Sequence, residues 1–532
     1  MSVLPVAKIA SAALAAAAAL PAGHATPTAG PRVELTFRVI DRAGNQVKPL
    51  DLQLLNMATR TNIDLGSGTR RQVRPGRYNV AAWIGTGTGP QSFTLADRII
   101  DVTRSRTITL DARQGRRVRV GLNVAGAVQE LLEIAPIVHG NWAFNPTTIA
   151  DTEGGGTFAV PAYVVPMRAR SVTLFVYSVW EKAGNTVASP SPFRYDIINV
   201  HRGGIPVHPT FPVRRSGLAR VTVRVRATDQ NQQATLELSP MSNSGPPLPL
   251  NAGTTLGATP ARLISYRSPG YNWQPIVDLT SPSGEIRDNV LNMNPYGHGR
   301  FTERYFGAVL APQAFQLSAG VEGRRLQASI SGPPFGDPLH PGSTDEGQGG
   351  TALMRLFAGS RLLARTHLDS FGGTVNARIP LARRIYGLHI DATRGASATV
   401  STELHAVWRF VAHGTTDNNS VGAQLYASEL LPAGLDSRNR AAGGALTPVA
   451  LRVFGFAPNG SFGARVVRAA RAQASADDGK TWHSVTVRRR GDHYVFSVRD
   501  PRQAGFVSLR VFVRDGAGNS ELLTVIRAYG VR

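Results

Sequence analysis

Alternation of apolar and polar residues is the dominant pattern along this chain. It runs through residues 33–39, 221–226 and 507–514, where every second residue is Val, Leu or Phe and most intervening residues are polar. A period of two predicts strands that bury one face and expose the other. Beyond the N-terminal segment, no helical period extends over more than about ten residues. The pattern therefore predicts an all-β protein.

Turn signals divide these strands at regular intervals. The chain contains 55 Gly and 35 Pro residues, spaced as punctuation rather than clustered. Three alternating segments end in similar turns, at residues 41–45 (DRAGN), 181–185 (EKAGN) and 515–519 (DGAGN). Gly tolerates positive φ there, and Asp or Asn can bond nearby backbone N–H groups. These turns indicate tandem immunoglobulin-like β-sandwiches, the alternative being chance recurrence in a Gly/Ala-rich chain.

Composition shifts predict the domain boundaries. Residues 238–261 are rich in Pro, Ser, Asn and Gly, which indicates a linker or a long loop, and residues 331–350 indicate a long loop inside a domain. We expect a signal peptide at 1–25, a carboxypeptidase-regulatory-like β-sandwich at 27–124, a β-sandwich at 125–237, a β-rich domain at 262–430 and an immunoglobulin-like β-sandwich at 436–532.

The N-terminus predicts export. Lys8 precedes an apolar stretch, Ile9 to Leu20, and the small residues Gly23 and Ala25 suit a signal peptidase. That stretch is shorter than the roughly 20 residues needed to span a bilayer. No later segment has 18 uncharged apolar residues, so we expect a secreted protein without a transmembrane segment. An uncleaved membrane anchor is the alternative.

Charge and cysteine content narrow the function classes. The chain has no Cys, which excludes disulfides, Cys-based zinc sites and a thiol nucleophile. Its net charge is +23, and only four of the 58 cationic residues are Lys. This excess of Arg reflects either a GC-rich genome or attraction to polyanions. The run Arg488, Arg489 and Arg490 is the candidate polyanion contact. No nucleic-acid-binding motif accompanies it, so we expect no specific nucleic acid partner.

One octet, SADDGKTW, has the full spacing of an Asp-box hairpin: Ser475, Asp477, Gly479, Thr481 and Trp482. In that motif the Asp side chain ties the hairpin backbone and the Trp packs beneath it. A sialidase propeller would repeat the box in several blades, whereas this chain has one full copy. We therefore interpret the octet as a structural hairpin. Trp482→Ala should cost about 3–5 kcal/mol if the indole is buried.

Catalytic motifs are missing from the sequence. It has no Gly-x-Ser-x-Gly elbow, no subtilisin-type nucleophile segment and no His-Glu-x-x-His motif. We therefore expect no catalytic, cofactor-binding or metal-ligating residue and no cofactor. The alternative is an extracellular hydrolase with an unrecognised site, protease-associated or of glycosidase type, that uses a carboxylate pair. Its candidate residues are Glu130, Glu133, Asp345 and Glu346.

Several segments resemble the non-catalytic C-terminal extension of large secreted bacterial subtilisin-like serine proteases. They are residues 435–440 (LDSRNR), 475–482 (SADDGKTW), 505–511 (GFVSLRV), 515–519 (DGAGN) and 524–532 (TVIRAYGVR). Residues 37–45, 75–78 and 109–113 resemble the carboxypeptidase-regulatory β-sandwich that follows such protease domains. A signal-like segment stands where the protease domain would be expected. The resemblance thus implies a free-standing accessory array and carries over no catalytic residue.

The preferred hypothesis is a secreted, non-catalytic, multi-domain β-sandwich protein. It would bind a surface, a cell-wall or other anionic polymer, or a protein partner, through arginine-rich faces and loops at the sandwich ends. A third hypothesis, suggested by the shared tail, is an inhibitor or chaperone of a related protease.

Overall fold

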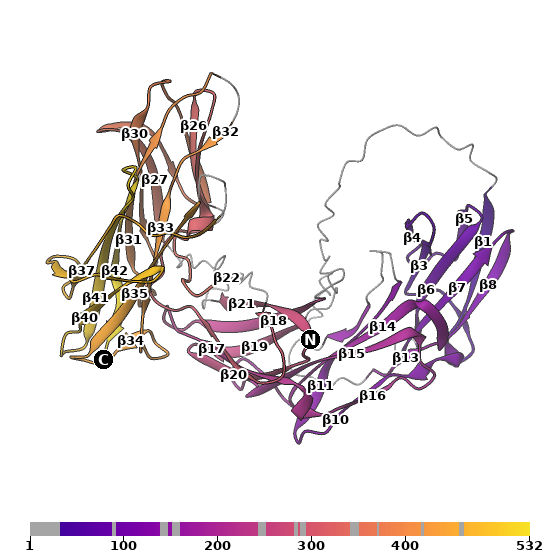
Figure 1. The fold of residues 1–532 in the computed structure, drawn as a ribbon. Helices are drawn as coiled ribbons and strands as arrows, with labels where there is room; N and C mark the ends of the chain where they lie inside the picture. The colour runs from indigo at the N-terminus through magenta and orange to yellow at the C-terminus, as the bar shows by residue number, and fades with distance from the viewer. Residues whose placement is uncertain are drawn as a thin grey trace, which may run out of the picture.

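The computed structural model describes residues 32–87, 92–138, 147–151, 160–242, 252–280, 286–287, 294–340, 350–369, 372–416, 420–456 and 462–532. Within these ranges the chain forms strands and three short 3-10 helices, with no α-helix (Figure 1). The predicted all-β fold with successive β-sandwiches is therefore confirmed. The segment 1–25, expected to be a signal peptide, lies outside the described residues.

The first sandwich lies inside the range 27–124. One sheet contains β1 (Val33–Ile40), β2 (Gln46–Val47), β5 (Arg70–Val73) and β8 (Arg106–Asp111); the other contains β3 (Asp51–Asn56), β4 (Asn62–Asp64), β6 (Gly76–Thr86) and β7 (Ser92–Val102), with η1 (Ala112–Gln114) after β8. Leu35 and Phe37 of β1 share one core with Leu54 and Val80 of the second sheet. The alternation in β1 thus points its apolar residues into this core.

The second sandwich is built on a seven-stranded sheet. In spatial order this sheet contains β12 (Thr147–Asp151), β11 (Ala127–Val138), β14 (Met167–Lys182), β15 (Phe193–Ile205), β20 (Ala261–Arg267), β17 (Ala219–Val225) and β24 (Arg300–Tyr305). The facing sheet contains β19 (Ala252–Ala258), β18 (Gln233–Ser242), β21 (Tyr271–Thr280), β22 (Ile286–Arg287) and β23 (Asn294–Pro295). The short elements β9 (Arg116–Arg117) and β13 (Ala162–Val164) extend the sheet of β7, β10 (Arg119–Leu122) pairs with β16 (Thr210–Val213), and η2 (Arg215–Gly217) precedes β17.

An apolar core lies on each face of the seven-stranded sheet. On one face, Val221 and Val223 share a core with Leu236 and Trp273 of the facing sheet. On the other face, Leu174, Val176 and Tyr195 share a core with Trp83 and Leu95 of the first sandwich. The two sandwiches therefore form a continuous stack of sheets.

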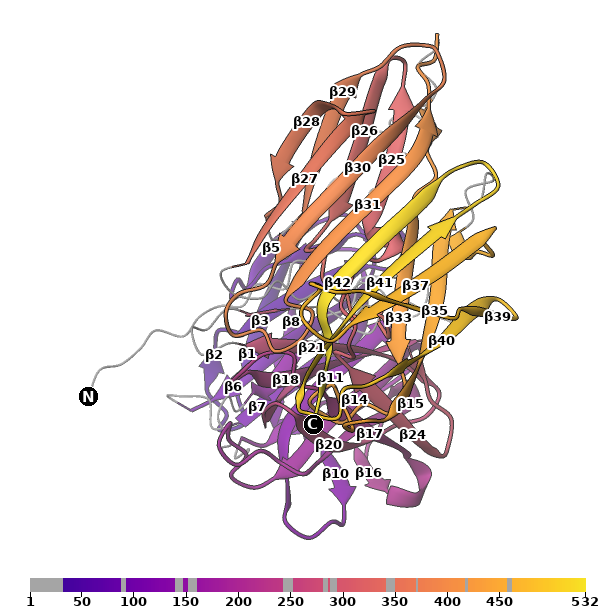
Figure 2. The ribbon, with the colours of Figure 1, turned by 90° about the vertical axis from the view of Figure 1, so that its left-hand side faces the viewer.

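The C-terminal part is organised around a nine-stranded sheet, and the strands of it that are labelled in Figure 2 lie side by side. It contains β28 (Arg361–His367), β27 (Thr351–Ala358), β30 (Arg384–Thr393), β31 (Glu403–Ala412), β42 (Ser520–Val531), β41 (Gly505–Arg514), β37 (Ala469–Ser475), β38 (His483–Val485) and β34 (Arg440–Ala441). One smaller sheet contains β29 (Gly372–Arg378), β26 (Arg325–Ser331), β25 (Leu317–Glu322) and β32 (Ser420–Gly422), with η3 (Ala314–Gln316) before β25. The other contains β33 (Tyr426–Pro432), β35 (Leu446–Phe456), β40 (His493–Arg499), β39 (Arg488–Arg490) and β36 (Phe462–Ala464).

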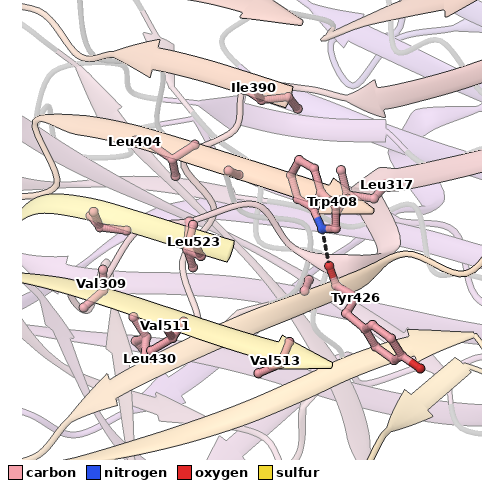
Figure 3. Packing of buried hydrophobic residues seen from close by; sticks show 14 of the residues in the cluster. Val309, Leu317, Ile390, Leu404, Trp408, Tyr426, Leu430, Val511, Val513 and Leu523 are labelled. Atoms are coloured by element: carbon pink, nitrogen blue, oxygen red, sulfur yellow. Dashed lines mark hydrogen bonds between the residues drawn. The ribbon is translucent and has the colours of Figure 1, made fainter. Parts of the chain in front are cut away.

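A single core joins all three of these sheets. Trp408 of β31 is fully buried in it, and its indole N–H donates to the Tyr426 carbonyl oxygen at 2.5 Å (Figure 3). Leu404 and Leu523 project into the same core from neighbouring strands. The nine-stranded sheet therefore carries both smaller sheets on one continuous apolar layer.

The predicted linker or long loop at 238–261 is wrong at both of its ends, where the structure has strands. Strand β18 continues to Ser242, and Leu238 pairs with Ala252 of β19, so these residues belong to a sheet. Buried Leu238 and Leu256 explain why they fold there. The Pro- and Asn-rich residues 243–251, which suggested a linker, lie outside the described residues.

The other inner boundaries also differ from the prediction. Strand β20, at the start of the predicted domain 262–430, pairs with β15 and β17 of the predicted domain 125–237. Strand β31 likewise pairs with β42, across the boundary near 430–436. These pairings join strands far apart in sequence, and alternation within one strand does not specify its neighbour.

Two of the repeated turns have the expected geometry. Gly44 and Gly518 have φ of 93° and 96°, the left-handed region that Gly adopts at little cost. In each turn the Asn N–H donates to the Asp Oδ1 at 2.8 Å, from Asn45 to Asp41 and from Asn519 to Asp515. The shared motif therefore marks equivalent side-chain-stabilised turns.

A polar junction joins the second sandwich to the C-terminal part. Asn439 is fully buried, and its Oδ1 accepts from the Ala308 N–H at 3.0 Å and from Arg226 Nη1 at 2.9 Å. Its Nδ2 donates to the carbonyl oxygens of Ala227 and Phe306, both at 3.1 Å. One side chain thus connects three segments that are far apart in sequence.

The segment 331–350, predicted as a long loop, is anchored at its N-terminal half. Asp337 is fully buried, where its Oδ2 accepts from the Phe306 N–H at 2.7 Å and its Oδ1 accepts from the Leu339 N–H at 3.0 Å. Phe335 packs in the C-terminal core. Residues 341–349, including the candidates Asp345 and Glu346, lie outside the described residues.

Candidate functional site

Arginines gather on the outward face of the sheet formed by β35, β40 and β39. Residues of β40 alternate between buried and accessible, which places His493, Val495 and Arg499 outward. Arg488 pairs with Val495, Arg490 pairs with His493, and Arg499 pairs with Leu446 of β35. Arg452 lies outward on β35 between buried Leu451 and Val453. We call Arg452, Arg488, Arg490 and Arg499 the cationic face.

The predicted triplet is divided by the strand period. Arg488 and Arg490 lie on the cationic face, whereas Arg489 pairs with the inward-facing Tyr494 and therefore points the other way. The Arg489 Nε donates to the Gly491 carbonyl oxygen at 3.0 Å. Arg452 and Arg499 were not among the residues predicted from the sequence, although each follows a buried strand residue in an alternating pattern.

Nearby acids leave the cationic face positive. Among the described residues, no carboxylate forms an ion pair with Arg488 or Arg490. Glu429 lies on β33 close to Arg452, but burial raises the pKa of its carboxyl to about 7, so it is only partly ionised near neutral pH. Asp492 is exposed and accepts from His493 Nδ1 at 2.9 Å. Four arginines therefore face one exposed acid and one largely buried one.

The Asp-box octet forms the hairpin between β37 and β38. Asp477 Oδ1 accepts from the Thr481 N–H at 2.9 Å, its Oδ2 accepts from Thr481 Oγ1 at 2.6 Å, and Ser475 Oγ accepts from the Gly479 N–H at 2.9 Å. Hydrogen bonds from Ser475 and Thr481 hold the pKa of Asp477 well below its usual range. Gly479 has a φ of 82°, and a Cβ there would lie 2.8 Å from Ile526 Cδ1. The octet thus builds a tight turn.

Trp482 is only half-buried, which differs from the full burial assumed in the sequence analysis. The Arg510 guanidinium lies 4.0 Å from the centre of the indole ring, and Arg510 Nε also donates to Thr524 Oγ1 at 3.1 Å. Arg510, Phe512 and Leu522 line a shallow groove of about 570 Å³ on the outward face of the nine-stranded sheet.

Because Trp482 keeps one side exposed, we expect Trp482→Ala to lower the free energy of unfolding by about 1–2 kcal/mol, the scale of a cation–π contact with partial burial. Urea unfolding of the C-terminal part would measure this change, with Trp482→Phe as the matched control. A loss above about 3 kcal/mol would mean that the indole is packed as a core residue.

Of the four carboxylate candidates for hydrolysis, the structure describes Glu130 and Glu133. Glu130 and Glu133 lie on the same strand, β11, and Glu133 is 3 % exposed. Asp345 and Glu346 fall outside the described residues.

Within the described ranges no group of three or more His, Asp or Glu side chains could hold a metal ion. In that same part of the chain, no helix is long and apolar enough to cross a membrane.

Comparisons with known proteins leave the family open. No protein-family model matches the sequence, and no curated protein matches it. The resemblance to protease extensions therefore remains a prediction.

Three solved structures give weak matches. The Bacillus anthracis TIE protein is 7% identical over 52% of this chain, with a TM-score of 0.12, and the chain covers only 50% of that protein. The chicken CNTN1 FN1-FN3 domains are 9% identical over 58% of this chain and 99% of theirs, with a TM-score of 0.14. The Bacillus cereus major pilin subunit BcpA is 8% identical over 52% of this chain and 98% of its own, with a TM-score of 0.12. With TM-scores this low, none of the three bears on the site.

Proposed function

We propose that this protein is a secreted, non-catalytic binding protein that attaches to an anionic polymer through the cationic face. The observation that supports this most directly is the convergence of Arg452, Arg488, Arg490 and Arg499 on one exposed sheet face. Guanidinium groups bind phosphate, sulfate and carboxylate groups through paired N–H donors. A net charge of +23 adds long-range attraction to any polyanion. The export-type N-terminus supports an extracellular polymer, such as one in a cell wall.

An exposed cationic sheet face suits a long chain with repeated charges. The strands lie about 4.8 Å apart and residues on one face recur about every 7 Å along a strand, so the arginines form a grid. Each arginine that neutralises one polymer charge releases counterions, which makes binding steeply dependent on salt. Binding of this kind needs no preformed pocket.

The Arg488→Ser/Arg490→Ser variant should elute from immobilised dextran sulfate at clearly lower salt than the parent protein. Each substitution removes one contact between an arginine and a sulfate group. The double variant should therefore also reduce the slope of log affinity against log salt concentration by about 1–2. Arg361→Ser/Arg365→Ser on β28 is the matched control, because it removes the same charge from exposed positions elsewhere. Equal shifts for both double variants would reduce the effect to net charge and contradict the proposed face.

Sedimentation with cell walls, at low salt and at about 1 M salt, tests the biological target. At 1 M the Debye length is about 3 Å, so purely electrostatic binding should be lost. Retention at that salt would indicate a further recognition surface, and no sedimentation at either salt would contradict wall binding.

A further inference from the structure

One edge of the first sandwich is left open beside a groove. Strand β7 pairs with β6 from Ser92 to Val102, but on its other side β13 covers only residues 93–95. The Val165 N–H donates to the Leu95 carbonyl oxygen at 2.8 Å, and the chain then leaves the sheet. Among the described residues, no strand pairs with residues 96–102 of β7 on this side. Proteins normally cover or shorten such an edge, because its free N–H and C=O groups accept another strand.

The backbone groups at this edge have a regular direction. The Phe93 N–H and the Leu95 carbonyl oxygen both bond the chain of β13, away from β6. Alternate residues of a strand direct their N–H and C=O groups to the same side. Asp97, Ile99 and Asp101 therefore direct theirs to the side away from β6, where Ile99 and Asp101 are accessible and Asp97 is buried.

A groove of about 750 Å³ runs along the open edge, within the roughly 300–1,000 Å³ typical of ligand sites. Its walls come from β7, from Thr109 to Asp111 at the end of β8, and from residues 165–171. Ile99, Met57 and Met167 form a partly buried apolar strip beside it. We call this the edge groove.

The lining of the edge groove contains four arginines, Arg77, Arg98, Arg168 and Arg170, and three aspartates. Arg168 and Arg170 are exposed, and no ion pair joins either to a described carboxylate. Of the three acids, Asp101 lies 3.9 Å from Arg77, Asp111 forms a 2.7 Å ion pair with Arg113, and Asp97 is buried. The two free arginines therefore favour an acidic ligand.

One buried polar atom at the edge groove also lacks a donor. Asp97 is 2 % exposed, and its Oδ1 accepts from Asn79 Nδ2 at 2.6 Å. Its Oδ2 has no hydrogen-bond partner among the described residues. This carboxyl lies buried beneath the edge groove, and burial raises its pKa to about 7.

We propose that the edge groove binds an extended acidic peptide segment, which adds as a strand to the open edge of β7. The repeated N–H and C=O groups of a peptide match those of Asp97, Ile99 and Asp101. Main-chain bonds of this kind supply affinity in strand addition, and alternate side chains supply specificity. One set of side chains would contact the apolar strip, and the acidic set would reach Arg168 and Arg170. This site is independent of the cationic face.

The test uses a fluorescein-labelled, end-blocked peptide of alternating Glu and Val, titrated into the full chain by fluorescence anisotropy. Arg168→Ser/Arg170→Ser should weaken binding by about tenfold or more, the loss expected for one or more charge-assisted hydrogen bonds. Arg70→Ser/Arg71→Ser, exposed on β5 and outside the groove, is the matched control and should leave binding unchanged. Hydrogen exchange should slow at the amides of Asp97, Ile99 and Asp101 when the peptide is present.

Two further probes distinguish the alternatives. The same peptide with alternate backbone N–H groups methylated should bind at least about tenfold more weakly, because it cannot complete the ladder. Equal binding of the methylated peptide, or no saturable binding of the parent peptide, would overturn strand addition. Polygalacturonate that binds with the same dependence on Arg168 and Arg170, while the peptide does not, would replace the proposal with an acidic-glycan site.

Discussion

Arg267→Met should lower the free energy of unfolding of the second sandwich by about 3–5 kcal/mol, because it leaves a buried carboxylate without its cation. Arg267 is fully buried on β20, and its Nη1 and Nη2 donate to Glu303 Oε1 and Oε2 at 2.9 and 2.8 Å. This two-bond geometry is the strongest form of an Arg–carboxylate pair. Burial alone would raise the pKa of Glu303, but the adjacent Arg267 overrides this effect and holds it below its usual value.

The pair belongs to a longer buried network. Arg267 Nε donates to Ser265 Oγ at 3.0 Å, and Ser265 Oγ donates to Asp196 Oδ2 at 3.3 Å. Asp196 in turn forms a 2.7 Å ion pair with Arg194 Nη2. Two fully buried arginines are thus satisfied by carboxylates inside one sandwich. Removing one partner of such a pair leaves the other charge buried without compensation, which strongly destabilises the folded state.

Native-state hydrogen exchange of amides in β17 and β20 would measure this change locally, because a chain with several cores need not unfold in one step. Arg224→Met, an exposed position on β17, is the matched control and should change little. The double variant Arg267→Met/Glu303→Leu should recover much of the loss, since apolar replacement of a whole buried pair is often neutral. An equally destabilised double variant would show that the loss of packing causes the effect, and that the unpaired buried carboxylate of Glu303 does not.

The sequence specified individual strands better than their neighbours. The alternating residues of β1, β17 and β41 lie in strands with the expected buried faces, and the Asp-box octet forms a hairpin, because both features depend on local geometry. The parallel pairing of β15 with β20 depends instead on packing between segments about 70 residues apart. The sharing of one sheet by β31 and β42 is of the same kind. For this reason the inner domain boundaries were wrong.

The candidate site likewise combines residues that the sequence reveals with residues that only the strand pairing brings together. The run of Arg488 to Arg490 was visible in the sequence, but Arg452 and Arg499 join it only through the register of β35 with β40 and of β40 with β39. Likewise, the open edge of β7 follows from the shortness of β13, which covers only three of its residues. A surface assembled across strands therefore requires the pairing to be known.

A buried carboxyl in the C-terminal core should make stability depend on pH. Glu521 follows the alternation of β42 inward with Leu523, and it is fully buried. Burial raises the pKa of its side chain to about 8, although a 2.6 Å hydrogen bond from Ser428 Oγ to Oε2 opposes the shift. In the unfolded chain this carboxyl has an ordinary pKa of about 4.3. The folded state therefore holds a proton that the unfolded state releases between these two values.

The sign of the effect follows from this difference in bound protons. Below the unfolded pKa both states are protonated, and Glu521 introduces no dependence on pH. From about pH 4.3 to pH 8 the unfolded state is favoured by about 1.4 kcal/mol per pH unit, and above pH 8 the dependence levels off. Stability should therefore fall as pH rises through this window, by about 4–5 kcal/mol in total from this one group.

Glu521→Gln should remove this slope, because glutamine stays neutral at every pH in the window. The decisive quantity is the difference in unfolding free energy between the variant and the parent protein at pH 5, 7 and 9, followed in the C-terminal part. Glu429 and Asp97, whose carboxyls also have a pKa raised to about 7 by burial, contribute slopes of the same sign to both proteins and cancel in the difference.

The unfolding free energy of Glu521→Gln minus that of the parent should increase by about 3–5 kcal/mol between pH 5 and pH 9. Ser428→Ala should act in the opposite direction, since losing the hydrogen bond that opposes the shift raises the pKa of Glu521 further and extends the window upward. A constant difference between Glu521→Gln and the parent from pH 5 to pH 9 would show that Glu521 has the same charge in the folded and unfolded states. In that case the buried face of β42 would have to open enough to hydrate the carboxylate.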